Sequence, residues 1–141
     1  MKEKNPFISY TTENMHPGFS VDCVILSYHK KKIRVLLNKF DFSNYWQLPG
    51  GFMFTHEGAD DAAMRILEAR TGLSGIYLRQ FYLFSDPERT KINQNREYLE
   101  VTASEKEAVN SRGSWFLQRF ITLGYLAFVR YDKVQILSTK E

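Results

Sequence analysis

The fold is indicated by one stretch of sequence: Trp46-Gln47-Leu48-Pro49-Gly50-Gly51, then Glu57, then Arg65-Ile66-Leu67, and finally Gly72-Leu73. The first three residues are followed by one proline and two glycines, which interrupt regular backbone structure. This part therefore predicts a short strand that ends in a glycine loop.

A helix is predicted over residues 57–71, directly after this loop. Apolar residues recur there at helical spacing, at Ala59, Ala62, Ala63, Ile66 and Leu67. Two aspartates in the first turn and Arg70 in the last turn suit the helix dipole, and Gly72 is a typical stop. A glycine loop before a helix N-terminus gathers backbone N–H groups, so this arrangement favours phosphate or another anion.

At these spacings the stretch resembles the signature of the Nudix hydrolase family. Its first glycine, glutamate and arginine match Gly51, Glu57 and Arg65, with five and then seven residues between them. Its later hydrophobic and glycine positions match Leu67, Gly72 and Leu73. The resemblance covers roughly residues 18–137. It implies an α/β fold, an α/β/α sandwich around a mixed central sheet.

The chain departs from this signature where the family has its magnesium ligands. Three glutamates of the family correspond here to Ile66, Ala69 and Arg70. Mg²⁺ prefers carboxylate and water oxygens, which a hydrocarbon, a methyl group and a guanidinium do not supply. Glu68 lies about 200° around the helix from residue 66, at about 100° per residue. We therefore predict no metal site and no required cofactor.

Two main classes of function remain open. The first is a non-catalytic sensing domain for a nucleoside-diphosphate sugar, ADP-ribose-like, or a free sugar. The second is a Nudix hydrolase that cleaves a nucleoside diphosphate linked to another moiety, with Mg²⁺ held differently, for instance by Glu57, Glu97 or Glu100. A scaffold without a small ligand is a third. The helix face expected to hold the metal has no carboxylate, so the first class is favoured and Glu57 is catalytic only in the second.

Further resemblances lie downstream. Phe84-Ser85-Asp86-Pro87-Glu88-Arg89 and Arg119-Phe120 resemble the Asp-Pro-Arg loop and Arg-containing strand of the ADP-ribose pyrophosphatase-like branch. With the altered signature, they also resemble the Nudix domain of Nudix-related transcriptional regulators, which carry a winged-helix domain for DNA. The ligand-binding residues that these resemblances imply are Gly50, Gly51, Phe52, Arg65, Arg70, Asp86, Arg89 and Arg119.

Several of these residues also have a plain structural interpretation. Asp86 fits a turn, and Arg119 fits a surface charge on a strand. Arg70 fits a solvated arginine that stabilises the end of a helix. Phe52 fits packing in the core of a small, aromatic-rich domain.

The rest of the chain predicts more strands around the helix. Residues 19–28 and 33–37 are apolar and β-branched on either side of Lys30-Lys31-Lys32, which predicts an antiparallel hairpin. Other strands are predicted at residues 76–84, 120–129 and 134–137. Residues 86–113 are predicted as a long loop with a short helix near residues 102–109.

The domain organisation follows from this order. We expect an irregular lead-in over residues 1–17 and one Nudix-like domain over residues 18–141. The C-terminal helix of the family is expected to be missing, so one sheet face should expose apolar side chains, which favours a homodimer. No winged helix is expected, so any DNA binding would come through a domain not in this chain.

Composition excludes other classes. The 141 residues are 25% charged and 15% aromatic, typical of one globular domain. The net charge is only +3, with one basic run, unlike dedicated nucleic-acid binders. The single cysteine, Cys23, excludes a disulfide framework and lies in an apolar run, which predicts a buried thiol. Without a signal peptide or a membrane-length apolar run, we predict a cytoplasmic protein with no membrane partner.

Overall fold

The computed structural model describes residues 18–39, 44–89 and 119–134. The elements are, in chain order, β1 (Gly18–His29), β2 (Lys32–Val35), β3 (Asn38–Lys39), β4 (Trp46–Gln47), β5 (Gly50–Phe52), α2 (Ala59–Thr71), β6 (Arg79–Phe84), β7 (Phe120–Phe128) and the 3-10 turn η1 (Tyr131–Lys133). The predicted lead-in, the helix near residues 102–109 and residues 135–137 lie outside these ranges.

The main sheet is mixed, as the family resemblance implies. Its strand order is β2-β1-β7-β6, and β5 also pairs with β1. β1 runs parallel to β7, from Gly18 opposite Phe120 to Leu26 opposite Phe128, whereas its pairings with β2 and β5 are antiparallel. β6 is antiparallel to β7, and β3 forms a separate pair with β4.

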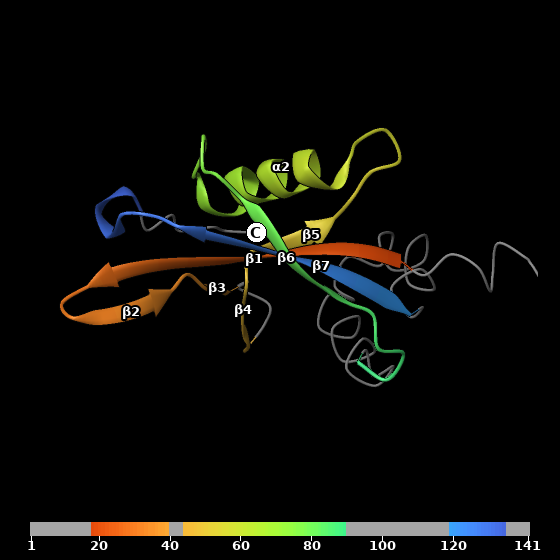
Figure 1. Cartoon of the computed structure of the whole chain (residues 1–141), viewed down its shortest axis with the longest axis horizontal. Coiled ribbons are helices and arrows are strands. Elements are labelled where there is room, and N and C mark those ends of the chain that lie inside the picture. Colours follow the sequence, from red (N-terminus) through yellow and green to blue (C-terminus); the bar gives the residue numbers. More distant parts are fainter. Residues whose placement is uncertain (1–17, 40–43, 90–118, 135–141) are drawn as a thin grey trace, which may run out of the picture.

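Helix α2 lies against one face of this sheet (Figure 1). The core between them contains Val21, Cys23 and Ile25 from alternate positions of β1, together with Ala62, Ala63, Ile66 and Leu67 of the helix and Tyr125 of β7. The predicted buried thiol is confirmed, because Cys23 is fully buried and this burial raises its pKa to about 12. The first helical turn is also tied to β7, since the hydroxyl of Tyr125 donates to Asp60 at 2.5 Å.

The helix ends as predicted and begins two residues later than predicted. Gly72 has a φ of 74°, and its N–H donates to the carbonyl of Glu68 at 2.8 Å. The helix therefore ends in a glycine with the left-handed conformation. At the other end the N-cap is Gly58. Glu57 is not part of the helix. Its side chain accepts the backbone N–H of Phe54 and so closes the loop before the helix.

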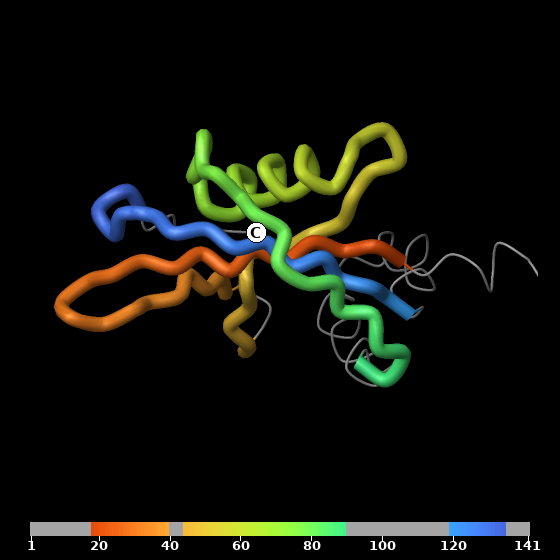
Figure 2. The backbone as a smooth tube through the Cα atoms, in the orientation of Figure 1, coloured from red at the N-terminus to blue at the C-terminus, as the bar shows by residue number. Residues whose placement is uncertain are grey.

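The predicted hairpin is confirmed and has a tight turn. The last pair is His29 opposite Lys32, and Lys30 and Lys31 between them both have positive φ, 49° and 63°. Figure 2 shows the hairpin running beside the chain that follows β7. There the ring of Tyr131 stacks on His29, with centroids 3.8 Å apart.

Two other strand predictions need correction. The predicted strand at residues 134–137 is wrong at Val134, which follows η1 and donates its N–H to the carbonyl of Tyr131. β6 begins at Arg79 instead of residue 76, and Ile76 and Leu78, which come before it, pack against the core.

Exposed apolar side chains do gather on the sheet, as expected for a bare face. Tyr28 and Ile33 lie directly opposite each other and are 68% and 70% exposed. Phe128, 72% exposed, pairs with Leu26, two residues from Tyr28, so these side chains share one face. We call Tyr28, Ile33 and Phe128 the apolar strip. The homodimer stays a prediction. Within the described ranges, no helix has the length and apolarity needed to cross a membrane.

Candidate functional site

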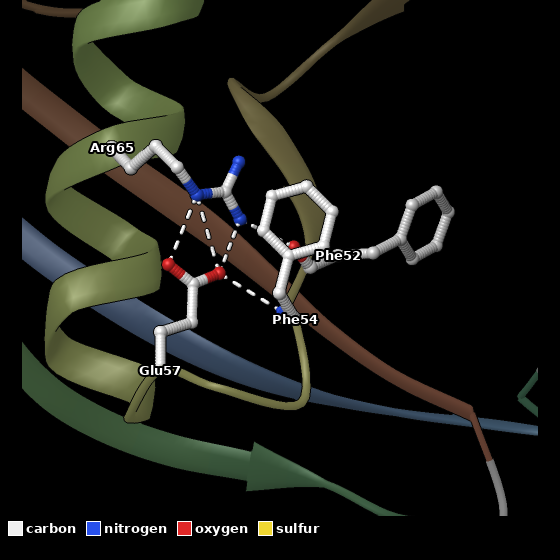
Figure 3. A network of polar contacts seen from close by, with 4 residues as sticks. All are labelled: Phe52, Phe54, Glu57 and Arg65. Atoms are coloured by element: carbon white, nitrogen blue, oxygen red, sulfur yellow. Dashed lines mark hydrogen bonds and ion pairs between the residues drawn. The ribbon is translucent and has the colours of Figure 1, made fainter.

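The loop between β5 and α2 is held by a carboxylate–guanidinium pair (Figure 3). Arg65 donates to both oxygens of Glu57, from Nε at 3.0 Å to Oε2 and from Nη2 at 2.5 Å to Oε1. Oε1 also accepts the backbone N–H of Phe54 at 2.9 Å. Only 10% of the Glu57 side chain is exposed. The carboxylate therefore joins the loop to the second turn of the helix.

The same guanidinium makes two further contacts, one with the end of β5 and one with the loop. Its Nη2 donates to the carbonyl of Phe52 at 2.7 Å, and it lies 4.2 Å from the centroid of the Phe54 ring. The Phe54 ring in turn stacks with His56, at 5.6 Å between centroids. The positions of Glu57 and Arg65 in the signature thus support the loop geometry, and a catalytic role for Glu57 stays an untested prediction.

This pair predicts a pH-dependent stability. Hydrogen bonds from Arg65, then from the backbone of Phe54, lower the pKa of Glu57 from 4.5 to about 2. A depressed folded pKa stabilises the fold above the unfolded pKa, and this stabilisation is lost as the pH falls toward 2. Glu57→Gln should therefore be less stable than the wild type at about pH 6, and the difference should shrink between about pH 4.5 and pH 2.

Urea unfolding across this range measures the effect. Asp61→Asn, which changes an exposed carboxylate of the same helix, is the control and should show a much weaker pH dependence. A stability difference for Glu57→Gln that stays constant down to pH 2 contradicts the prediction.

The two glycines lie in a strand, which corrects the predicted glycine loop. Gly50 and Gly51 pair with Asp22 and Val21 of β1, and the helix begins well after them, at Ala59. Both positions are crowded. A Cβ on Gly50 would lie 2.1 Å from Asp22 Oδ1, and a Cβ on Gly51 would lie 3.1 Å from Ile66 Cγ1. Close packing, not a loop of free N–H groups, favours glycine at both positions.

The three helix positions that differ from the family signature have different environments. Ile66 is 3% exposed and packs under Gly51, whereas Ala69 is exposed. Arg70 is partly buried, and its Nε donates to the carbonyl of Gly50 at 3.3 Å. Asn38 of β3 donates to the backbone carbonyl of Arg70 at 3.2 Å. At these positions the helix therefore has a buried apolar side chain, Ile66, and a cationic one, Arg70.

The donor set does not fit a magnesium ion in the part of the chain that the structure describes. No group of three His, Cys, Asp or Glu side chains is placed there to hold a metal. The carboxylate of Glu57 is engaged by Arg65 and Phe54. Glu97 and Glu100, named above as alternative ligands, lie outside the described residues.

A second polar cluster lies around the start of β1 and β7. Arg89 donates from Nη2 to the hydroxyl of Thr122, and this hydroxyl is 2.6 Å from that of Ser20. Asp22 is two residues along β1 from Ser20, and its pKa is raised by burial, an effect that the charge of Arg89 partly offsets. The guanidinium of Arg89 also lies 5.9 Å from the centroid of the Phe84 ring.

Asp86 and Arg119 lie at the edge of this cluster. The carboxylate of Asp86 accepts the N–H of Glu88 at 2.9 Å, as in a turn. Arg119 donates to the carbonyl of Ser85 at 2.6 Å, and so joins the end of β6 to the start of β7. These contacts agree with the structural interpretation of both residues, and their ligand role stays a prediction.

The structure thus brings the predicted residues into two neighbouring groups. Gly50 and Phe52 lie on β5 opposite Asp22 and Ser20. The ring centroid of Phe52 lies 5.5 Å from that of Phe120. Arg65 and Arg70 approach β5 from the helix. Ser20, Asp22 and Thr122 were not predicted as site residues. For Ser20 and Asp22 the only signal in the sequence is two polar residues at alternate positions of an apolar strand.

Comparisons with known proteins agree with this geometry. The NUDIX domain profile matches residues 16–134. A MutT/nudix family protein from Enterococcus faecalis is 25% identical with a TM-score of 0.61, over 94% of this chain and 44% of its own. The chain therefore spans less than half the length of that protein.

Two other solved structures share the fold at lower identity. The NUDIX domain of Shewanella oneidensis NrtR, complexed with ADP ribose, is 23% identical with a TM-score of 0.58, over 98% of this chain and 79% of its own. A C. elegans Ap4A hydrolase is 15% identical with a TM-score of 0.57, over 86% of this chain and 76% of its own. No curated protein matches the sequence significantly. Because the family profile covers most of its length, this chain belongs to the NUDIX domain family.

Proposed function

We propose that this chain is a ligand-sensing Nudix domain that binds a nucleoside-diphosphate sugar of the ADP-ribose kind, or a sugar, without hydrolysing it. One observation carries the proposal: the helix has a buried isoleucine and a guanidinium, at positions 66 and 70, where the family signature has carboxylates. A guanidinium neutralises phosphate oxygens directly and can do so by a bidentate contact.

The surroundings of β5 support binding of a diphosphate sugar. Arg70 and Arg65 reach β5 from the helix, and Arg89 lies over the start of β7. The ring of Phe52, 37% exposed, offers a surface for a base or a sugar. ADP ribose is the ligand in the similar NrtR domain, which supports the choice of ligand class.

A role in transcriptional regulation is part of this proposal. NrtR from Shewanella oneidensis, a structural neighbour, has also been solved with a 27mer DNA. DNA binding by the present protein would occur through a domain not in this chain. The homodimer and the cytoplasmic location remain predictions of the same kind.

Binding and turnover of ADP-ribose test the proposal. In calorimetry with a chelator present, ADP-ribose should bind without divalent metal, and its affinity should fall as salt rises because charged contacts are screened. With Mg²⁺ or Mn²⁺, neither ADP-ribose nor a dinucleoside polyphosphate should be hydrolysed.

The alternative outcomes separate the other classes. Turnover that is abolished by Glu57→Gln would contradict the proposal and support the hydrolase. Neither binding nor turnover, in a chain that unfolds cooperatively, would support a scaffold.

A further inference from the structure

A separate cavity lies at the hairpin end of the sheet. Its volume is about 510 Å³, within the usual size of small-molecule sites. Apolar side chains from the centre of the molecule line it: Ile25 is 1% exposed, and Leu36 and Val129 pack against the core. None of the residues proposed above to bind a nucleotide sugar lines this cavity.

Two aromatic rings on its wall are each supported by a neighbour. Tyr131 stacks on His29, with an angle of 13° between the rings. Trp46 has the ammonium group of Lys39 5.8 Å from its ring centroid. Both rings line the cavity and are well exposed, Trp46 by 62% and Tyr131 by 43%. They can therefore contact a flat ligand in the cavity.

The charge of the cavity has one sign. Arg34, opposite Ser27 in the hairpin, is its only charged lining residue within the described ranges. No hydrogen bond or ion pair joins Arg34 to another described residue. Asp132, the acidic residue of the neighbouring η1, is paired with Arg130 at 2.7 Å. An anionic group would therefore be attracted to the guanidinium.

From this combination we propose that the cavity binds a small aromatic anion, a flat apolar body that carries one carboxylate or sulfonate group. The aromatic body packs on the apolar floor and against Trp46 and Tyr131, and the anionic group pairs with Arg34. This site is independent of the nucleotide-sugar site and does not rest on the proposed function.

The dye 8-anilinonaphthalene-1-sulfonate has this chemistry and is the probe. A fluorescence titration of the full chain should show one dominant site. Arg34→Gln should weaken binding about tenfold or more, the range for a hydrogen bond to a charged group. Trp46→Leu should weaken it several-fold through loss of the ring contact. Arg79→Gln changes an exposed arginine of β6, outside the cavity, and should leave the affinity unchanged.

Four results would overturn the proposal. Unchanged affinity in Arg34→Gln is one, if circular dichroism shows that the variant is folded. Loss of binding in Tyr28→Ser or Phe128→Ser, but not in Arg34→Gln, would place the dye on the apolar strip. Displacement of the dye by saturating ADP-ribose would show that the sites are not separate. Binding only after truncation beyond Val134 would show that residues 135–141 occupy the cavity.

Discussion

Ile66→Glu should lower the free energy of unfolding by about 3–5 kcal/mol at neutral pH, the usual effect of an uncompensated buried charge. This substitution restores a carboxylate of the family signature. In this protein, however, residue 66 is 3% exposed and packs under Gly51 and against the core. A glutamate there would lose its hydration, and it would compete with the carbonyl of Gly50 for the guanidinium of Arg70, four residues along the helix. Urea unfolding measures the loss, and Mg²⁺ should not restore stability or activity.

The pH dependence identifies the cause. Burial should raise the pKa of the introduced carboxyl, so the loss is fully present well above this raised pKa and falls as the pH decreases through it. The loss should thus be smaller at about pH 5 than at about pH 7.5. Ile66→Val is the packing control and should cost only about 0.5–1.5 kcal/mol at either pH. Full stability of Ile66→Glu with Mg²⁺ present would contradict the predicted loss of the metal site.

Arg70→Ala should weaken ADP-ribose binding by about 1.5–3 kcal/mol, or roughly 10- to 150-fold. This follows if the guanidinium takes over the neutralisation of phosphate that the family assigns to metal. Arg70→Glu should weaken binding further and restore no turnover, because Ile66 and Ala69 remain. Calorimetry with a chelator present measures both variants.

Arg70→Ala should also have a small effect on stability. Because Arg70 Nε donates to the carbonyl of Gly50, Arg70→Ala should also cost about 0.5–1 kcal/mol of stability, the range for a modest hydrogen bond. Arg79→Ala, at an exposed position of β6, is the matched control and should change neither quantity. Unchanged affinity in Arg70→Ala would leave Arg70 with a structural role only.

Local sequence patterns predicted the elements whose cause is local. The helical spacing of alanines and Ile66, with Gly72 as the stop, predicted α2, because backbone geometry and a left-handed cap depend on nearby residues. The hairpin β1–β2 was predictable for the same reason. Spacing alone could not show that Gly50-Gly51 forms a strand, because that depends on pairing with β1, nearly thirty residues earlier in the chain.

The candidate site likewise has some features that follow from local sequence and others that depend on tertiary packing. The amino-acid sequence established the family signature, with Glu57 and Arg65 at its spacing, and the lack of carboxylates at positions 66, 69 and 70, since residue type and spacing are local properties. The ion pair between Glu57 and Arg65 was found only in the structure. Long-range folding established the rest: Arg89 meets Thr122, and Arg70 meets Gly50, across separations that no local pattern reports. Whether an arginine faces solvent, a carbonyl or a ligand depends on which distant strand packs beside it.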